Sequence, residues 1–65
     1  MVVSTAGRNI HIDGARVGMP LALFDMQGRV IHVGRTVAPS VDLYVPNPGS
    51  YLVKIGSSVK LVRIK

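Results

Sequence analysis

The sequence of 65 residues contains no cysteine, no tryptophan and no glutamate. The lack of cysteine excludes a disulfide framework and a thiolate metal site. No apolar run approaches the roughly 18 residues of a membrane-spanning helix, and residues 1–4 carry no cleavable signal pattern. The only carboxylates are three aspartates, and the only aromatic residues are one phenylalanine and two tyrosines. This composition leaves little material for paired-carboxylate chemistry or for a base-stacking surface.

Length and charge set the remaining limits. A chain of 65 residues supports one domain, and its 48% hydrophobic content is enough for a core, which argues against disorder. The net charge of +5 favours acidic partners such as nucleic acid, anionic lipid or lipopolysaccharide, or an acidic protein surface. The eight lysines and arginines are spread along the chain and form no basic block.

Hydrophobic residues alternate with polar ones along most of the chain, as in Ile10-His11-Ile12 and Tyr51-Leu52-Val53-Lys54-Ile55. A period of two is typical of half-buried strands. Glycine, proline and aspartate interrupt the alternation at short intervals. The pattern predicts six or seven short strands, over residues 2–5, 8–13, 19–25, 29–36, 41–45, 50–56 and 59–64. Short strands bounded by turns indicate an all-β sandwich or small barrel.

Three connections between strands can be predicted in more detail. In Asp25-Met26-Gln27-Gly28, the aspartate can accept a hydrogen bond from a backbone N–H and the glycine can adopt the left-handed conformation, which predicts a hairpin. Gly56-Ser57-Ser58 predicts a second hairpin between the last two strands. Two prolines exclude residues 46–49 from a central strand, so this segment should be an exposed connection.

The alternation also predicts which side chains face the core. Leu61-Val62 breaks the pattern, and we place Val62 and Ile64 inside, with a bulge or a sheet edge nearby. The other predicted core residues are Ile10, Ile12, Leu21, Leu23, Val41, Leu43, Val45, Tyr51, Val53 and Ile55.

The residues that carry chemistry fit structural roles better than catalytic ones. His11 and His32 each stand between apolar residues, which predicts surface imidazoles and no metal site. Asp13 and Asp25 precede turns, and Asp42 alternates outward. The glycine-rich residues 14–18 are followed by no predicted helix that would bind phosphate. We therefore expect no catalytic residue, metal or cofactor, and no enzyme.

Two binding functions remain open as alternatives. A carbohydrate-binding or substrate-targeting accessory module of a glycoside hydrolase would require Phe24, Tyr44 and basic residues to converge on one face. A small nucleic-acid-binding barrel would require the basic residues to cluster, and its stacking surface would be poor. The least specific interpretation is a solvated face with interspersed positive charge.

Three segments together resemble a known family. Leu21–Ile31, with Asp25 and Gly28, resembles the strand-turn-strand motif of type IX secretion C-terminal sorting domains. Gly49–Ile55, with Tyr51 two residues after Gly49, resembles their Gly-x-Tyr strand, and Val59–Lys65 resembles their basic terminal strand. The resemblance covers about residues 8–65 and extends to the basic terminal domains of secreted plant-cell-wall-degrading enzymes. The Pro-Asn-Pro stretch that opens many members has no counterpart at the start of this chain.

This resemblance implies an immunoglobulin-like antiparallel sandwich of about seven strands. It also implies that residues 1–65 form a single C-terminal module of a larger secreted protein, which travels through the periplasm to the outer cell surface. The partners would be the outer-membrane sorting machinery and anionic lipopolysaccharide, and we expect a monomer with no small-molecule substrate. We assign recognition to the terminal strand, namely Val59, Lys60, Leu61, Val62, Arg63, Ile64 and Lys65.

Overall fold

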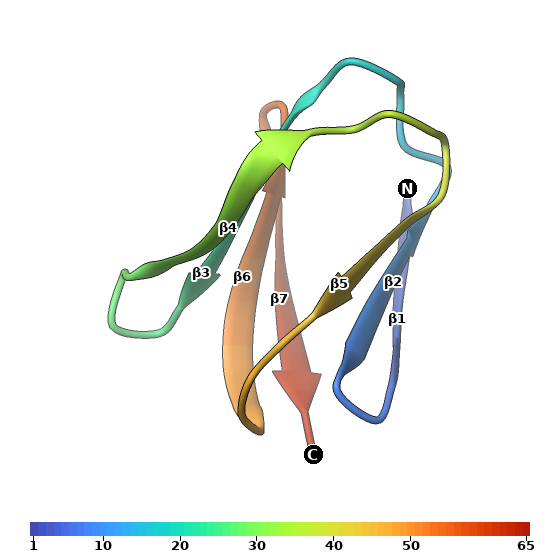
Figure 1. Cartoon of the computed structure of the whole chain (residues 1–65). Helices are drawn as coiled ribbons and strands as arrows, with labels where there is room; N and C mark the ends of the chain where they lie inside the picture. Colours follow the sequence, from blue (N-terminus) through green and yellow to red (C-terminus); the bar gives the residue numbers. More distant parts are fainter.

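A computed structural model describes residues 1–65 as seven antiparallel strands in two sheets, with no helix (Figure 1). The strands are β1 (Val2–Ala6), β2 (Asn9–Asp13), β3 (Pro20–Asp25), β4 (Val30–Arg35), β5 (Val41–Tyr44), β6 (Gly49–Ile55) and β7 (Ser58–Ile64). The prediction of a small all-β domain is confirmed, and the predicted strand ends agree with these bounds to within one residue.

The two sheets are consistent with a β-sandwich. One sheet has three strands in the order β1-β2-β5, and the other has four in the order β4-β3-β6-β7. Their apolar inner faces form one core of buried side chains from both sheets. At one side of the sandwich the edge strands β1 and β7 contact each other. At the other side, the edge strands β4 and β5 flank an open cleft.

The core contains eleven of the twelve side chains predicted from the alternation. Val41 is the exception: it lies at the margin of the core and is half-buried. Two buried residues were not predicted, Ala15 in the loop after β2 and Thr36 at the end of β4. Ala15 lies outside the predicted strands, and Thr36 is a polar residue at the end of one, so the pattern of apolar residues does not mark either as buried.

Thr36 fixes the loop that crosses from the first sheet to the second. Its hydroxyl donates a hydrogen bond to the carbonyl of Arg16 and accepts one from the amide of Met19 at 3.0 Å. Its backbone carbonyl accepts from the amide of Gly18 at 2.7 Å. These bonds satisfy a hydroxyl that is 2% exposed, as a buried polar group requires. They also tie residues 16–19 to the end of β4.

The predicted turn between β3 and β4 is confirmed. One oxygen of Asp25 accepts from the amides of Gln27 and Arg29, both at 2.9 Å. The other accepts from the Nε of Arg29 at 3.1 Å. Gly28 has φ = +85°, in the left-handed region that glycine adopts without penalty. The predicted hairpin between β6 and β7 and the exposed connection over residues 46–49 are also present.

The last strand is regular, and the predicted inward positions of Val62 and Ile64, with a sheet edge nearby, are confirmed. β7 is a sheet edge, as expected, but it pairs with β6 without a bulge. Lys60 lies opposite the buried Val53 and so takes a core-side position, while Leu61 points outward. The bulge lies instead between β3 and β4, where the register shifts between Leu23 and Phe24 and Ile31 is the extra residue.

The ends of the chain lie at opposite ends of the sandwich (Figure 1). The structure contains no helix long and apolar enough to cross a membrane.

Candidate functional site

The predicted recognition segment, residues 59–65, forms most of the edge strand β7. Its inward side chains Val62 and Ile64 are 6% and 2% exposed and belong to the core. Its other side chains are exposed: Val59, Lys60, Leu61, Arg63 and Lys65. Since β7 pairs only with β6, its second edge has no strand partner within this chain. The segment therefore presents side chains to a partner, and the backbone groups of its second edge are unpaired in a sheet and lie in a groove beside β1.

The positive charges of β7 are less engaged than most of those elsewhere in the chain. Arg8 donates to the carbonyl of Pro46 at 2.9 Å, and Arg35 donates to that of Gly18 at 3.0 Å. Arg29 is paired with Asp25. No side-chain hydrogen bond or ion pair holds Lys60, Arg63 or Lys65, so β7 and the residue after it form the main local group of available cations.

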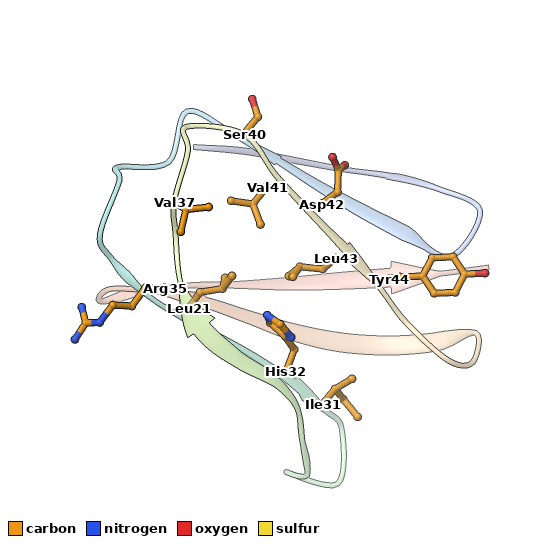
Figure 2. Close-up of a pocket in the computed structure, with 10 residues that line it drawn as sticks. All are labelled: Leu21, Ile31, His32, Arg35, Val37, Ser40, Val41, Asp42, Leu43 and Tyr44. Atoms are coloured by element: carbon orange, nitrogen blue, oxygen red, sulfur yellow. The ribbon is translucent and has the colours of Figure 1, made fainter.

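A cleft of about 560 Å³ opens between the edge strands β4 and β5. Its inner wall is apolar and includes Leu21, Ile31 and Leu43 (Figure 2). His32 extends toward the cleft, whereas Asp42 and Tyr44 point away from it (Figure 2). Ser40, at its rim, donates a hydrogen bond to Asp13 at 2.8 Å. The cleft thus has an apolar wall and separated polar groups. No nucleophile that lines it is hydrogen-bonded to a base that also lines it.

A polar cluster on the outer face of the three-stranded sheet engages Asp42. Its Oδ1 accepts from the Nδ2 of Asn9 at 2.9 Å and from the Nδ1 of His11 at 2.8 Å. The hydrogen bonds from Asn9 and then His11 hold the pKa of Asp42 below its ordinary value. The hydrogen bond that His11 donates to Asp42, with the negative charges of Asp42 and Asp13, raises the pKa of His11.

The other two carboxylates have structural partners as well. Asp13 accepts from the amide of Gly14 at 3.1 Å and from Ser40. The backbone hydrogen bond from Arg29, followed by that from Gln27, lowers the pKa of Asp25. No group of three His, Cys, Asp or Glu side chains lies close enough to hold a metal ion. Each aspartate therefore has a structural role: Asp25 stabilises its turn, whereas Asp13 and Asp42 also join segments that are distant in the sequence.

The two aromatic residues considered for carbohydrate binding do not converge. Phe24 lies opposite Val30 and Leu52, on the outer face of the four-stranded sheet. Tyr44 lies opposite Asn9, on the outer face of the three-stranded sheet, and is 74% exposed. Because these faces lie on opposite sides of the sandwich, the arrangement required by the accessory-module alternative is absent.

The sequence did not indicate the Asn9-Asp42-His11 cluster or the cleft. Both depend on which strands become neighbours: β2 pairs with β5 across a gap of 27 residues, from Asp13 to Val41. A signal existed in part, since Asn9, His11 and Asp42 all occupy outward positions in alternating segments. Alternation gives the face of a residue but not its neighbour on the next strand.

Comparison with protein-family models, with curated proteins and with solved structures finds no match. The resemblance to sorting domains stays a prediction based on the three segments quoted above.

Proposed function

We propose that this chain is a non-catalytic C-terminal module that directs secretion and cell-surface attachment of a larger bacterial protein through a type IX system. One observation carries the proposal. The segments Leu21–Ile31, Gly49–Ile55 and Val59–Lys65 are separated in the sequence, but they supply the three adjacent strands β3, β6 and β7 of one sheet, together with the first two residues of β4. The residues behind the resemblance thus belong to one structural unit, as a shared recognition element would require.

The strand order supports an immunoglobulin-like topology as part of this proposal. In constant-type immunoglobulin domains, strands 1, 2, 5 and 4 form one sheet and strands 3, 6 and 7 form the other. Here strands 1, 2 and 5 share one sheet, and strands 3, 6 and 7 share the other. The difference is the fourth strand, which extends the second sheet beside β3.

Tyr51 gives a second, local argument for that topology. It lies near the start of the sixth strand, is 5% exposed, and its hydroxyl donates to the carbonyl of Asn47 at 2.5 Å. A tyrosine at this place, bonded to the backbone a few residues upstream, is the corner motif of immunoglobulin-like sandwiches. It accounts for the tyrosine of the Gly-x-Tyr segment in structural terms, because it anchors the exposed connection before β6.

The mechanism that we propose for β7 is strand addition to a receptor. A sheet edge offers backbone donors and acceptors that an extended receptor segment can pair with, while alternate side chains supply specificity. Lys60, Arg63 and Lys65 would add attraction to an anionic outer surface, including lipopolysaccharide. Such binding uses backbone groups and charge and needs no chemical step.

The test is a fusion of residues 1–65 to an inert reporter that is exported to the periplasm of a host with a type IX system. If deletion of residues 59–65 keeps the reporter from the cell surface, the result is ambiguous. The deletion also removes Val62 and Ile64 from the core, so a failure to fold would give the same result. The informative variants are Lys60→Glu and Arg63→Glu, which change exposed side chains. Arg16→Glu makes the same charge change in an exposed loop and is the matched control.

We expect the unmodified fusion and the Arg16→Glu control to display or release the reporter at the cell surface. Lys60→Glu and Arg63→Glu should retain it in the periplasm, although circular dichroism of the purified modules shows an intact fold. Retention of the unmodified fusion would refute the sorting function. Normal surface delivery after deletion of residues 59–65 would refute the role of β7.

A further inference from the structure

The outer face of the four-stranded sheet is apolar across its full width. The pairing register places four side chains directly opposite one another in one row over all four strands. Leu61 in this row is 66% exposed and Val30 is 56% exposed. In order from β4 to β7, the row is Val30, Phe24, Leu52 and Leu61.

A second row lies beside the first and is apolar except at one position. The bulge at Ile31 keeps Val33 on the outer face together with Val30, and Val33 is 72% exposed. From β4 to β7 this row is Val33, Ala22, Lys54 and Val59. Directly opposite side chains on a sheet are close neighbours, so the two rows form one continuous surface, which we call the apolar face.

The other sheet shows what an ordinary solvated face looks like in the same molecule. Its outward positions form rows such as Ser4, His11 and Asp42, and Ala6, Asn9 and Tyr44. Antiparallel sheets that cover a core on one side normally expose polar residues on the other. The four-stranded sheet departs from this rule. A contiguous apolar surface of this kind is typical of a protein interaction site.

The charges around the apolar face select the kind of partner. Lys54 is exposed within the second row, and Arg63 follows Leu61 on β7, opposite Ser50. The face carries no carboxylate, since Asp13 and Asp42 belong to the other sheet and Asp25 is bonded within its turn. A second copy of the chain would therefore bring cations against cations with no counter-charge, which disfavours self-association.

We propose that the apolar face is a docking surface for a protein whose own surface is apolar and carries carboxylates that meet Lys54 and Arg63. The inference is independent of the sorting function, because it concerns outward side chains and not the backbone edge of β7. A lipid surface fits less well. Proteins bind membrane interfaces largely through tryptophan and tyrosine, whereas this face consists of valine, leucine and alanine with a half-buried Phe24 and has no tryptophan or tyrosine.

The chain itself supplies a probe with the proposed chemistry. The substitution Lys54→Glu gives a copy of the module whose apolar face carries a central carboxylate. Because Lys54 is exposed, the variant should fold. Isotope-labelled wild-type module is titrated with unlabelled Lys54→Glu module, and amide chemical shifts are followed by NMR. Unlabelled wild type and a Lys54→Glu/Leu61→Lys double variant are the matched control probes. Vesicles of phosphatidylglycerol form a separate arm.

We expect shifts concentrated on β4, β3, β6 and β7, with binding to the Lys54→Glu probe several-fold tighter than to wild type and lost with the double variant. Absent shifts, or shifts centred on β1, β2 and β5, would overturn the proposal. Equal binding to unlabelled wild type would identify a second copy as the occupant instead. Vesicle binding through the same face, with no preference for the carboxylate probe, would identify a membrane surface and also overturn it.

Discussion

At Gly28, the effect of adding a side chain on stability should come from the backbone conformation alone. It has φ = +85°, and a Cβ added there would meet no atom within 4 Å. Gly28→Ala should therefore lower the free energy of unfolding by about 1–2 kcal/mol, the strain of a left-handed backbone in a residue with a side chain. Thermal unfolding followed by circular dichroism measures this, with roughly 4–8 °C expected per kcal/mol in a domain of this size.

Gly34→Ala is the matched control for that substitution. Gly34 lies within β4, has no positive φ, and an added Cβ would meet only the Nε2 of His32, at an ordinary 3.8 Å. The change should leave the melting temperature nearly unaltered or raise it slightly, because alanine restricts the unfolded chain. Equal losses in both variants would show that left-handed strain is not the cause at Gly28.

The His11–Asp42 pair should make stability depend on pH. The pKa of His11 is raised above 6.5 in the folded state. The stability that His11 contributes to the fold is therefore fully present below pH 6.5 and is lost as pH rises through the folded pKa. The pKa of Asp42 is lowered from 3.8, so its contribution is present above 3.8 and is lost as pH falls through its folded pKa. The pair therefore stabilises the fold most between these two values.

An NMR titration of the His11 ring checks this prediction directly. In the unmodified protein the midpoint should lie above 6.5, and Asp42→Asn should lower it, since the main hydrogen bond and the nearest negative charge are lost together. Asp13→Asn should lower it less, because Asp13 acts only through its charge. A midpoint that Asp42→Asn leaves unchanged would contradict the contact.

These residues also mark where prediction from sequence succeeds and fails. The turn of Asp25 and Gly28 could be predicted, because its donors, acceptor and required backbone conformation all lie within five consecutive residues. The bond between His11 and Asp42 spans 31 positions, and that between Thr36 and Arg16 spans 20. No local pattern encodes which distant residues meet, so these two contacts could not be predicted.

At the scale of the element, Lys60 should keep the free edge of β7 from pairing with another copy of this chain. It occupies a core-side position opposite Val53, in the opening beside Val3 and Thr5 of β1. Inward-pointing charges are a known device that protects sheet edges from association. Lys60→Val should therefore produce concentration-dependent association in sedimentation velocity, while Lys60→Arg, which keeps the charge, should remain like the unmodified protein. Sedimentation of Lys60→Val as a monomer at every concentration would refute this role.

The same lysine explains why the alternation of this strand is interrupted in the sequence but not in the structure. From Ser58 to Ile64 the strand alternates without interruption, but a lysine fills one inward position and a leucine fills an outward one. Alternation predicts faces only if inward residues are apolar and outward ones polar. That condition holds for β2, whose inward residues were both identified. In β6 the inward residues were identified although the outward Leu52 is apolar, so the condition is met only in part. It fails at the edge strand β7, where an inward position carries a charge. It also fails in the four-stranded sheet, which is apolar on both of its faces.

For the whole molecule, strand number and core could be predicted, but the division into sheets could not. The assignment of β4 to the sheet of β3, and of β5 to that of β2, rests on pairings between segments. The apolar face and the cleft are consequences of that division. Both therefore appear only when the sheets are assembled, although most of the residues that form them had been assigned to a strand; Val37 and Ser40 of the cleft lie between two predicted strands.

A single shared core should make the stability of this molecule sensitive to one side chain. A chain of 65 residues is expected to have roughly 3–10 kcal/mol of stability, and it buries a small fraction of its surface compared with larger domains. Leu23 is 0% exposed and belongs to the core between the sheets. Leu23→Ala should cost about 2–5 kcal/mol, which is enough to leave much of the protein unfolded near 37 °C.

Leu61→Ala removes the same atoms from a side chain that is 66% exposed and should change stability by less than about 0.5 kcal/mol. Urea unfolding measures both, and a similar loss for the two would mean that the sheets do not share one core or that the apolar face is covered in solution.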